Sequence, residues 1–145
     1  MFLPLSNSIL KILNILDINI TFHDDFLSEE LINNKRSLVF FGYLDSKPDC
    51  CFKCGVIKDD RIIKYGTKIS RVKMMKISGL DIYLDLKKQK YFCYHCNHSF
   101  ISITNVVDYR CHISNNTKKS VINDAKKIKT NLDIARDHNI SNMTV

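Results

Sequence analysis

Two Cys-x-x-Cys motifs bracket the middle of this sequence and limit its folding more than any other feature. They are Cys51-Phe52-Lys53-Cys54-Gly55 and Cys93-Tyr94-His95-Cys96, with 38 residues between Cys54 and Cys93. Each motif can place two thiolates on a tight turn, and two such turns complete a tetrahedral shell for one Zn²⁺ ion. No coordination position then remains for water or substrate. We therefore expect one structural zinc ion, held by Cys51, Cys54, Cys93 and Cys96.

Other interpretations of these cysteines explain less of the pattern. Disulfide bonds are typical of secreted domains, and the sequence shows no secretory signal. A single Cys-x-x-Cys can be a thioredoxin-like redox motif, but no βαβ pattern surrounds the first motif and the second would have no role. Replacement of one ligand by His98 or by Cys50 stays open. We otherwise expect both to be bystanders, as are His95, Cys111 and His112.

The composition indicates a globular protein, with 45% hydrophobic and 26% charged residues in a chain of 145. A membrane span needs about 20 apolar residues. Lys11, Asn14 and Asp17 interrupt the one hydrophobic stretch near the N-terminus. That stretch also lacks the basic start and the small-residue cleavage site of a signal peptide. We expect a soluble, cytoplasmic protein with no membrane partner.

The net charge of +7 is unevenly distributed. Residues 1–46 carry 3 basic and 6 acidic side chains, residues 47–100 carry 12 and 5, and residues 101–145 carry 7 and 4. The basic excess thus lies around the cysteine motifs and continues to the C-terminus, a distribution that suits a phosphate backbone. A solvated lysine-rich face would have the same counts, so charge alone leaves both interpretations open.

The N-terminal part predicts one helix and one strand. Ser6 or Ser8 could cap a helix whose apolar residues recur at helical spacing: Ile9, Ile12, Leu13 and Leu16. Such a stripe favours packing against the protein's own core. Residues 37–44 are dense in β-forming side chains and predict a strand, whereas residues 19–36 give no clear signal. We assign residues 1–46 to this helix and lead-in strand.

Between the cysteine motifs the hydrophobic pattern has a period of two. Residues 69–77 and 80–86 predict a β-hairpin with a turn at Ser78-Gly79. A hairpin that feeds a Cys-x-x-Cys motif is typical of a zinc ribbon, where the metal substitutes for a core too small to hold the strands. We assign residues 47–104 to a zinc ribbon with a hairpin insert. Phe92 and Phe100 are expected to cover the zinc sulfurs, with base stacking as the alternative.

Helical spacing returns near the C-terminus, in residues 112–145. A lysine-rich helix is predicted with an apolar stripe along it: Val121, Ile122, Ala125 and Ile128. The overall expectation is therefore an α+β fold, with an N-terminal helix, a small zinc-ribbon β domain and a C-terminal helical segment.

Residues 133–145 have the spacing of a helix-turn-helix. A small residue, Ala135, stands where two helices cross, and Asn139 tolerates the positive φ of the turn. The expected buried contacts are Ile134, Ile140 and Val145. Ser141 would cap a recognition helix of which only residues 141–145 are present, so we expect the chain to be truncated relative to a longer parent. Two ordinary packed helices would also fit this short pattern.

The sequence resembles the N-terminal region of bacterial insertion-sequence transposases of the ISL-three type. The resemblance covers nearly the whole chain and rests on the first cysteine motif, Ile63-Lys64-Tyr65-Gly66, residues 84–96, Ile113-Ser114 and residues 133–145. Tyr65 stands where such proteins often have His, and Lys90 stands where Arg is common; neither is an expected zinc ligand. Similar proteins place a zinc ribbon before a helix-turn-helix and then an RNase-H-like domain whose carboxylates bind divalent metal and cut DNA.

The resemblance implies the DNA-binding N-terminal fragment of such a transposase, which recognises the terminal inverted repeats of its own element for DNA transposition. The catalytic domain is absent, and the 15 acidic residues are scattered. No Gly-rich phosphate loop, nucleophile elbow or His-Glu-x-x-His motif occurs, so we do not expect these residues to be an enzyme.

The expected partner is double-stranded DNA, and a second copy of the chain is a further candidate. Base edges or phosphates would be contacted by Ser141, Asn142 and Thr144, and the DNA backbone by Lys118, Lys119, Lys126 and Arg136. Two alternatives remain. One is a non-enzymatic zinc-ribbon module whose basic face meets a protein, and the other is a short, free-standing DNA-binding regulator.

Overall fold

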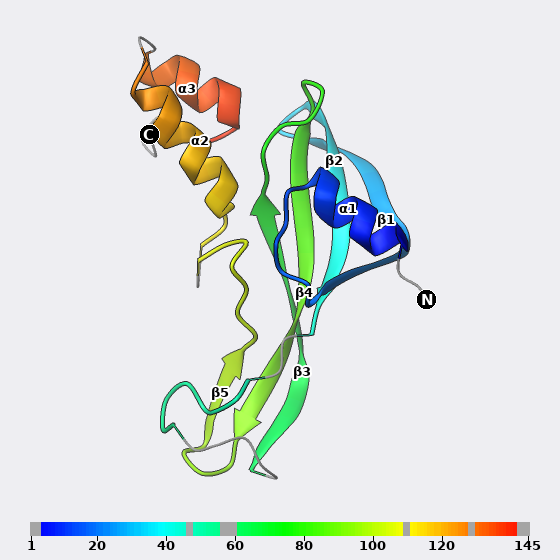
Figure 1. Cartoon of the computed structure of the whole chain (residues 1–145), viewed down its shortest axis with the longest axis vertical. Coiled ribbons are helices and arrows are strands. Elements are labelled where there is room, and N and C mark those ends of the chain that lie inside the picture. The colour runs from blue at the N-terminus through cyan, green and yellow to red at the C-terminus, as the bar shows by residue number, and fades with distance from the viewer. Residues whose placement is uncertain (1–3, 46–47, 56–60, 109–110, 128–129, 142–145) are drawn as a thin grey trace.

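A mixed β-sheet forms the body of the molecule, with one helix before it and two after it (Figure 1). The computed structural model describes residues 4–45, 48–55, 61–108, 111–127 and 130–141. In these ranges the elements follow the order α1 (Pro4–Ile12), β1 (Ile20–Ile32), β2 (Lys35–Leu44), β3 (Ile62–Lys73), β4 (Asp81–Cys93), β5 (His98–Ile101), α2 (Asn115–Ala125) and α3 (Asn131–His138). The predicted α+β class is confirmed.

Strand pairing joins the N-terminal segment to the cysteine-rich segment. The strand order is β1-β2-β4-β3, and β5 pairs with the C-terminal end of β4. β2 runs parallel to β4, from Ser37 opposite Asp81 to Leu44 opposite Lys88. One sheet therefore contains strands from both the predicted N-terminal segment, residues 1–46, and the predicted zinc ribbon, residues 47–104.

The strand β1 lies in residues 19–36, which gave no clear sequence signal. It pairs antiparallel with β2 through a turn in which Asn33 and Asn34 both have positive φ, 54° and 61°. Its first residues are buried, including Ile20 and Phe22, but a register shift follows Phe22 and most later side chains are exposed. The shift breaks the alternation that marks a strand, and the exposed acidic residues suit an edge strand that must avoid other chains.

The predicted hairpin between the cysteine motifs is confirmed, but β3 ends at Lys73 rather than at residue 77, and both strands extend further toward the cysteine motifs. β3 and β4 pair antiparallel from Ile62 opposite Cys93 to Lys73 opposite Tyr83. At the turn, Ser78 and Gly79 have φ of 52° and 77°, and the backbones of Ile77 and Leu80 exchange two hydrogen bonds. Positive φ at both central residues is the geometry that matches strand twist in a tight hairpin turn.

The N-terminal helix is shorter than its predicted apolar stripe. Ile9 and Leu13 are buried, but Ile12 is 64% exposed and Leu16, beyond the end of α1, is 81% exposed. Ser6 and Ser8 both lie inside α1 rather than at its N-terminal cap, so the predicted cap is wrong. The buried hydroxyl of Ser6 donates to the carbonyl of Phe22 and accepts from the N–H of the same residue. This contact ties α1 to the start of β1.

Two hydrophobic clusters occupy opposite faces of β4. The larger includes Ile82, Leu84 and Leu86 with residues of α1, β1 and β2. The smaller includes Tyr91 and Cys93. Successive side chains of a strand point to opposite faces, so the even-numbered and odd-numbered residues of β4 serve different cores. Of the metal ligands predicted from the sequence, Cys51 and Cys93 belong to the smaller cluster and Cys96 packs against it, whereas Cys54 is exposed.

Candidate metal centre and basic helical surface

Both Cys-x-x-Cys turns end in a residue with a left-handed backbone. Gly55 follows Cys54 with φ of 75°, and Asn97 follows Cys96 with φ of 55°. Gly adopts this conformation freely and Asn tolerates it, which explains both residue types. In the first turn, the N–H of Lys53 donates to the Cys51 sulfur at 3.4 Å. Asn97 is a local signal for the second turn that the sequence analysis did not use.

The structure brings the four predicted cysteines together. Their sulfurs all lie within 4.8 Å of one another, with 3.6 Å between Cys51 and Cys96 and 3.8 Å between Cys54 and Cys93. A tetrahedron with Zn–S bonds of about 2.3 Å has sulfurs about 3.8 Å apart. The cluster is therefore consistent with a single structural metal site, and zinc is the ion that four thiolates suit best.

The four thiols cannot all ionise easily without a cation. Burial acts to raise the pKa of Cys51, but hydrogen bonds from the backbone and side chains around it, chiefly from the Cys54 and Lys53 N–H groups, lower it to about 6. Burial, followed by interactions with the other three thiols, raises the pKa of Cys96 to about 12. Like charges at this distance oppose one another. Formation of the full thiolate set is thus linked to binding of a cation.

Only one of the two phenylalanines expected over the sulfurs lies there. Phe100 packs in the smaller cluster with Cys51 and Cys93, and the centroid of its ring lies 4.6 Å from the centroid of the Phe52 ring. The prediction for Phe92 is wrong, because Phe92 lies on the opposite face of β4 from Cys93. Its ring instead contacts Tyr65 and Tyr94, at centroid distances of 5.5 Å and 5.1 Å.

Within the described ranges, the four cysteines alone form the metal-ligating group. The ring of His98 lies against the Lys53 ammonium instead, at 3.0–3.2 Å. Cys50 and Cys111 are free thiols outside the group. His98 is exposed and Cys50 is partly exposed. In this geometry neither His98 nor Cys50 takes the place of a cluster cysteine.

The helices α2 and α3 follow the sheet as an adjacent pair (Figure 1). Ser114 caps α2 and Thr130 caps α3, each by accepting a backbone hydrogen bond. Asn139 ends α3 in the left-handed conformation, with φ 56° and ψ 45°, as the helix-turn-helix spacing predicts. Its side-chain amide donates to the Tyr83 hydroxyl at 2.8 Å and so anchors the turn on β4.

Buried contacts of the helical pair agree only in part with the predictions. Ile134 and Ala135 are 1% and 4% exposed, as expected for a helix crossing. The predicted stripe of α2 is not a buried face, since Ile122 is 57% exposed and the buried residue of that helix is Thr117. Ile128, Asn142, Thr144 and Val145 lie outside the described residues, so the expected recognition helix is described only at Ser141.

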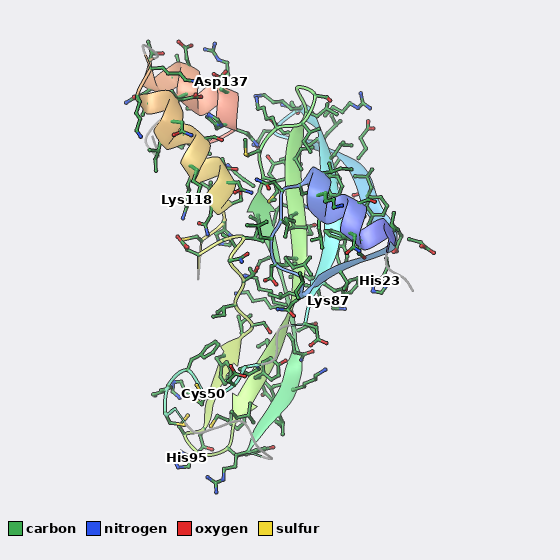
Figure 2. All side chains as sticks on the ribbon, viewed as in Figure 1. His23, Cys50, Lys87, His95, Lys118 and Asp137 are labelled. Atoms are coloured by element: carbon green, nitrogen blue, oxygen red, sulfur yellow. The ribbon has the colours of Figure 1, made fainter. Side chains whose placement is uncertain are left out.

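The expected DNA-contacting side chains differ in how they are engaged. Lys118, which is labelled in Figure 2, forms an ion pair with Asp108 at 3.1 Å. This contact raises the pKa of the lysine and lowers the pKa of the Asp108 carboxyl. Arg136 is 64% exposed and lies 3.7 Å from Asp133 on the same helix. The other described candidates, Lys119, Lys126 and Ser141, are exposed. Three of the four basic candidates therefore present their charge largely to solvent.

None of the described helices has the length and apolar character needed to cross a membrane. Comparison with models of protein families, with curated proteins and with solved structures finds no match to this chain.

Proposed function

We propose that this chain is the DNA-binding part of a bacterial insertion-sequence transposase of the ISL-three type. It would hold one structural zinc ion and recognise duplex DNA at the ends of its element. Base edges would be read by the segment that begins at Ser141, while α2 and α3 would contact the DNA backbone. The proposal assigns these residues binding and no catalytic step.

The observation that carries this proposal is the left-handed turn at Asn139 between α3 and Ser141. The turn is fixed from two sides, because the N–H of Ile140 donates to the Ala135 carbonyl at 3.0 Å and the Asn139 amide reaches the Tyr83 hydroxyl. A tight turn after a helix with a small buried residue is the local geometry of a helix-turn-helix. Exposed basic side chains border it, which suits phosphate contacts.

The charge distribution supports the same function. Residues 47–145 carry the basic excess of the chain, whereas residues 1–46 are net acidic. The contact of α2 with DNA would involve Lys119 and Lys126 more than Lys118, because Asp108 already neutralises Lys118. Each phosphate contact releases condensed counterions, so binding by such a surface weakens as salt rises.

The proposal is tested by duplex binding of charge-neutral variants of the zinc-loaded chain, measured by fluorescence anisotropy. Arg136→Gln and Lys126→Gln should each weaken binding and reduce the slope of log K against log salt by about 0.9. Lys11→Gln is the matched control, because Lys11 is an exposed lysine on α1 in the acidic N-terminal segment.

Equal affinities for Arg136→Gln, Lys126→Gln, Lys11→Gln and the unchanged chain would refute a DNA surface on the helical pair. Duplex affinity no higher than that of any cationic protein of this charge would favour the zinc-ribbon module that binds a protein partner.

A further inference from the structure

The face of β4 opposite the metal cluster carries a row of three aromatic rings. The Phe92 ring contacts both the Tyr65 ring and the Tyr94 ring, at centroid distances of 5.5 Å and 5.1 Å. The two tyrosines are 56% and 59% exposed. These side chains do not cover the cysteine cluster, since Phe100 and Tyr91 do so from the other face. Tyr65, Phe92 and Tyr94 therefore belong to neither hydrophobic cluster.

Three lysines lie on the same face, beside the aromatic row. The ammonium of Lys90 lies 5.8 Å from the centre of the Tyr65 ring. Lys68 and Lys88 are directly opposite each other in the β3–β4 ladder. They line a hollow of about 360 Å³ together with Ser70, Ser102 and His112. The Ser102 hydroxyl already donates to the Gln89 carbonyl, so the groups of the hollow that can donate to a ligand are the two ammonium groups, the Ser70 hydroxyl and the His112 imidazole.

The opposed lysines are unfavourable for the isolated chain. Like charges directly opposite in a sheet destabilise it. Burial, and then the charge of Lys68, lowers the pKa of Lys88. Among the described residues neither lysine is paired with a carboxylate, and β3, β5 and residues 86–93 contain no Asp or Glu at all. An anion in the hollow would remove the repulsion that the chain itself leaves uncompensated.

We propose that this face of the β3–β4 hairpin binds single-stranded DNA, with a phosphate in the Lys68–Lys88 hollow and bases stacked on Tyr65 and Tyr94. Aromatic side chains that stack bases beside a cationic groove are the usual means of binding single strands. A duplex would not serve, because its bases are already stacked on one another. This inference rests on the proposed DNA-binding function and adds a second surface on the β3–β4 hairpin, which runs from the middle of the molecule toward its metal end (Figure 1).

The test uses the zinc-loaded full chain and a labelled oligothymidylate of about 12 nucleotides, within the range of known single-strand site sizes. Tyr65→Ala and Tyr94→Ala should each lower affinity about tenfold, the range expected for loss of one base stack. Because the chain has no Trp, stacking is also observed directly as quenching of tyrosine fluorescence, which both variants should reduce. Tyr43→Ala is the control, since Tyr43 lies on the other face, beside Lys87.

The lysines have a closely matched control within one strand. Lys88→Gln should reduce the salt slope for the oligothymidylate by about 0.7, the value for one phosphate contact on a single strand. Lys87→Gln removes the same charge from the adjacent residue on the opposite face and should leave the slope unchanged. Zinc content and circular dichroism of each variant confirm that the fold is retained. If a tyrosine-to-alanine variant does not fold, the comparison of Lys88→Gln with Lys87→Gln decides whether this face binds the single strand.

Failure of this inference differs from failure of the proposed function. Absence of oligothymidylate binding, or equal effects of Lys88→Gln and Lys87→Gln, would overturn the single-strand surface while duplex binding still depended on Arg136. If duplex binding ignored Arg136 but the hairpin variants lost the single strand, the helical surface would be wrong and the hairpin surface would stand.

Discussion

Removal of the metal should unfold one end of the molecule and leave the other end folded. The cysteine cluster lies where β3, β4 and β5 meet, and the larger core lies toward the other end of β4 (Figure 2). The larger core contains none of the four cluster cysteines. We therefore expect a chelator to release β5 and both cysteine turns, while the pairing of β2 with β4 persists.

The expected size of the effect follows from the small cluster itself. Its apolar part is Ile62, Tyr91 and Phe100. Burial of these three side chains stabilises it by about 7 kcal/mol. Ordering residues 51–55 and 93–101 costs about 1–2 kcal/mol per residue, roughly 20 kcal/mol in all. The shortfall of roughly 13 kcal/mol is within the ~10–16 kcal/mol that a structural Zn²⁺ supplies in small zinc domains.

Amide hydrogen exchange with and without a chelator measures this difference along a single strand. Protection at Tyr91 and Cys93 should be lost on metal removal, while protection at Leu84 and Leu86 should persist. Cys51→Ser should reproduce the effect of the chelator. Cys50→Ser is the matched control, since Cys50 is the adjacent thiol outside the cluster.

Retention of protection at Tyr91 after complete metal removal would refute the argument, because the small cluster would then hold without an ion. Loss of metal in Cys50→Ser, with metal retained in Cys51→Ser, would instead shift the ligand set by one residue.

Three further predictions follow from individual side chains. Leu84→Ala should lower the free energy of unfolding by about 2–5 kcal/mol in urea denaturation, because Leu84 is fully buried, and a change under about 1 kcal/mol would contradict the core assignment. Asn139→Ala should cost about 1–2 kcal/mol for its left-handed backbone, and Asn139→Gly should cost less; equal losses would contradict this reason. The Asp108 carboxyl should titrate in NMR below its ordinary pKa because of the hydrogen bond from Lys118, and Lys118→Gln should restore the ordinary value. Since the folded-state pKa is lowered, any stability from this pair is present above the unfolded-state pKa and is lost as pH falls through the folded-state pKa; an unchanged titration in Lys118→Gln would refute the pairing.

Features determined by neighbouring residues could be predicted from the sequence. The spacing of the cysteines predicted which four sulfurs meet, and Ser78-Gly79 predicted the hairpin turn. Asn139 likewise predicted a left-handed turn after a short helix. In each case the residue type reflects a local backbone requirement, so few distant contacts are needed to specify it.

Features that depend on pairing between distant segments of the chain could not be predicted from the sequence. The parallel pairing of β2 with β4 depends on residues separated by more than 40 positions in the chain. Phe92 and Phe100 look equivalent beside a cysteine motif, but only the strand register decides which face each one takes. The exposure of Ile122 has the same origin, because α2 packs through Thr117 and not through its apolar stripe.

The salt dependence of duplex binding by the zinc-loaded chain tests the central claim most directly. With Lys119, Lys126 and Arg136 as the available backbone contacts, a plot of log K against log salt should fall with a slope of about −3. A slope near zero, or a slope unchanged when Arg136 is neutralised, would contradict the account of this chain as a DNA-binding module.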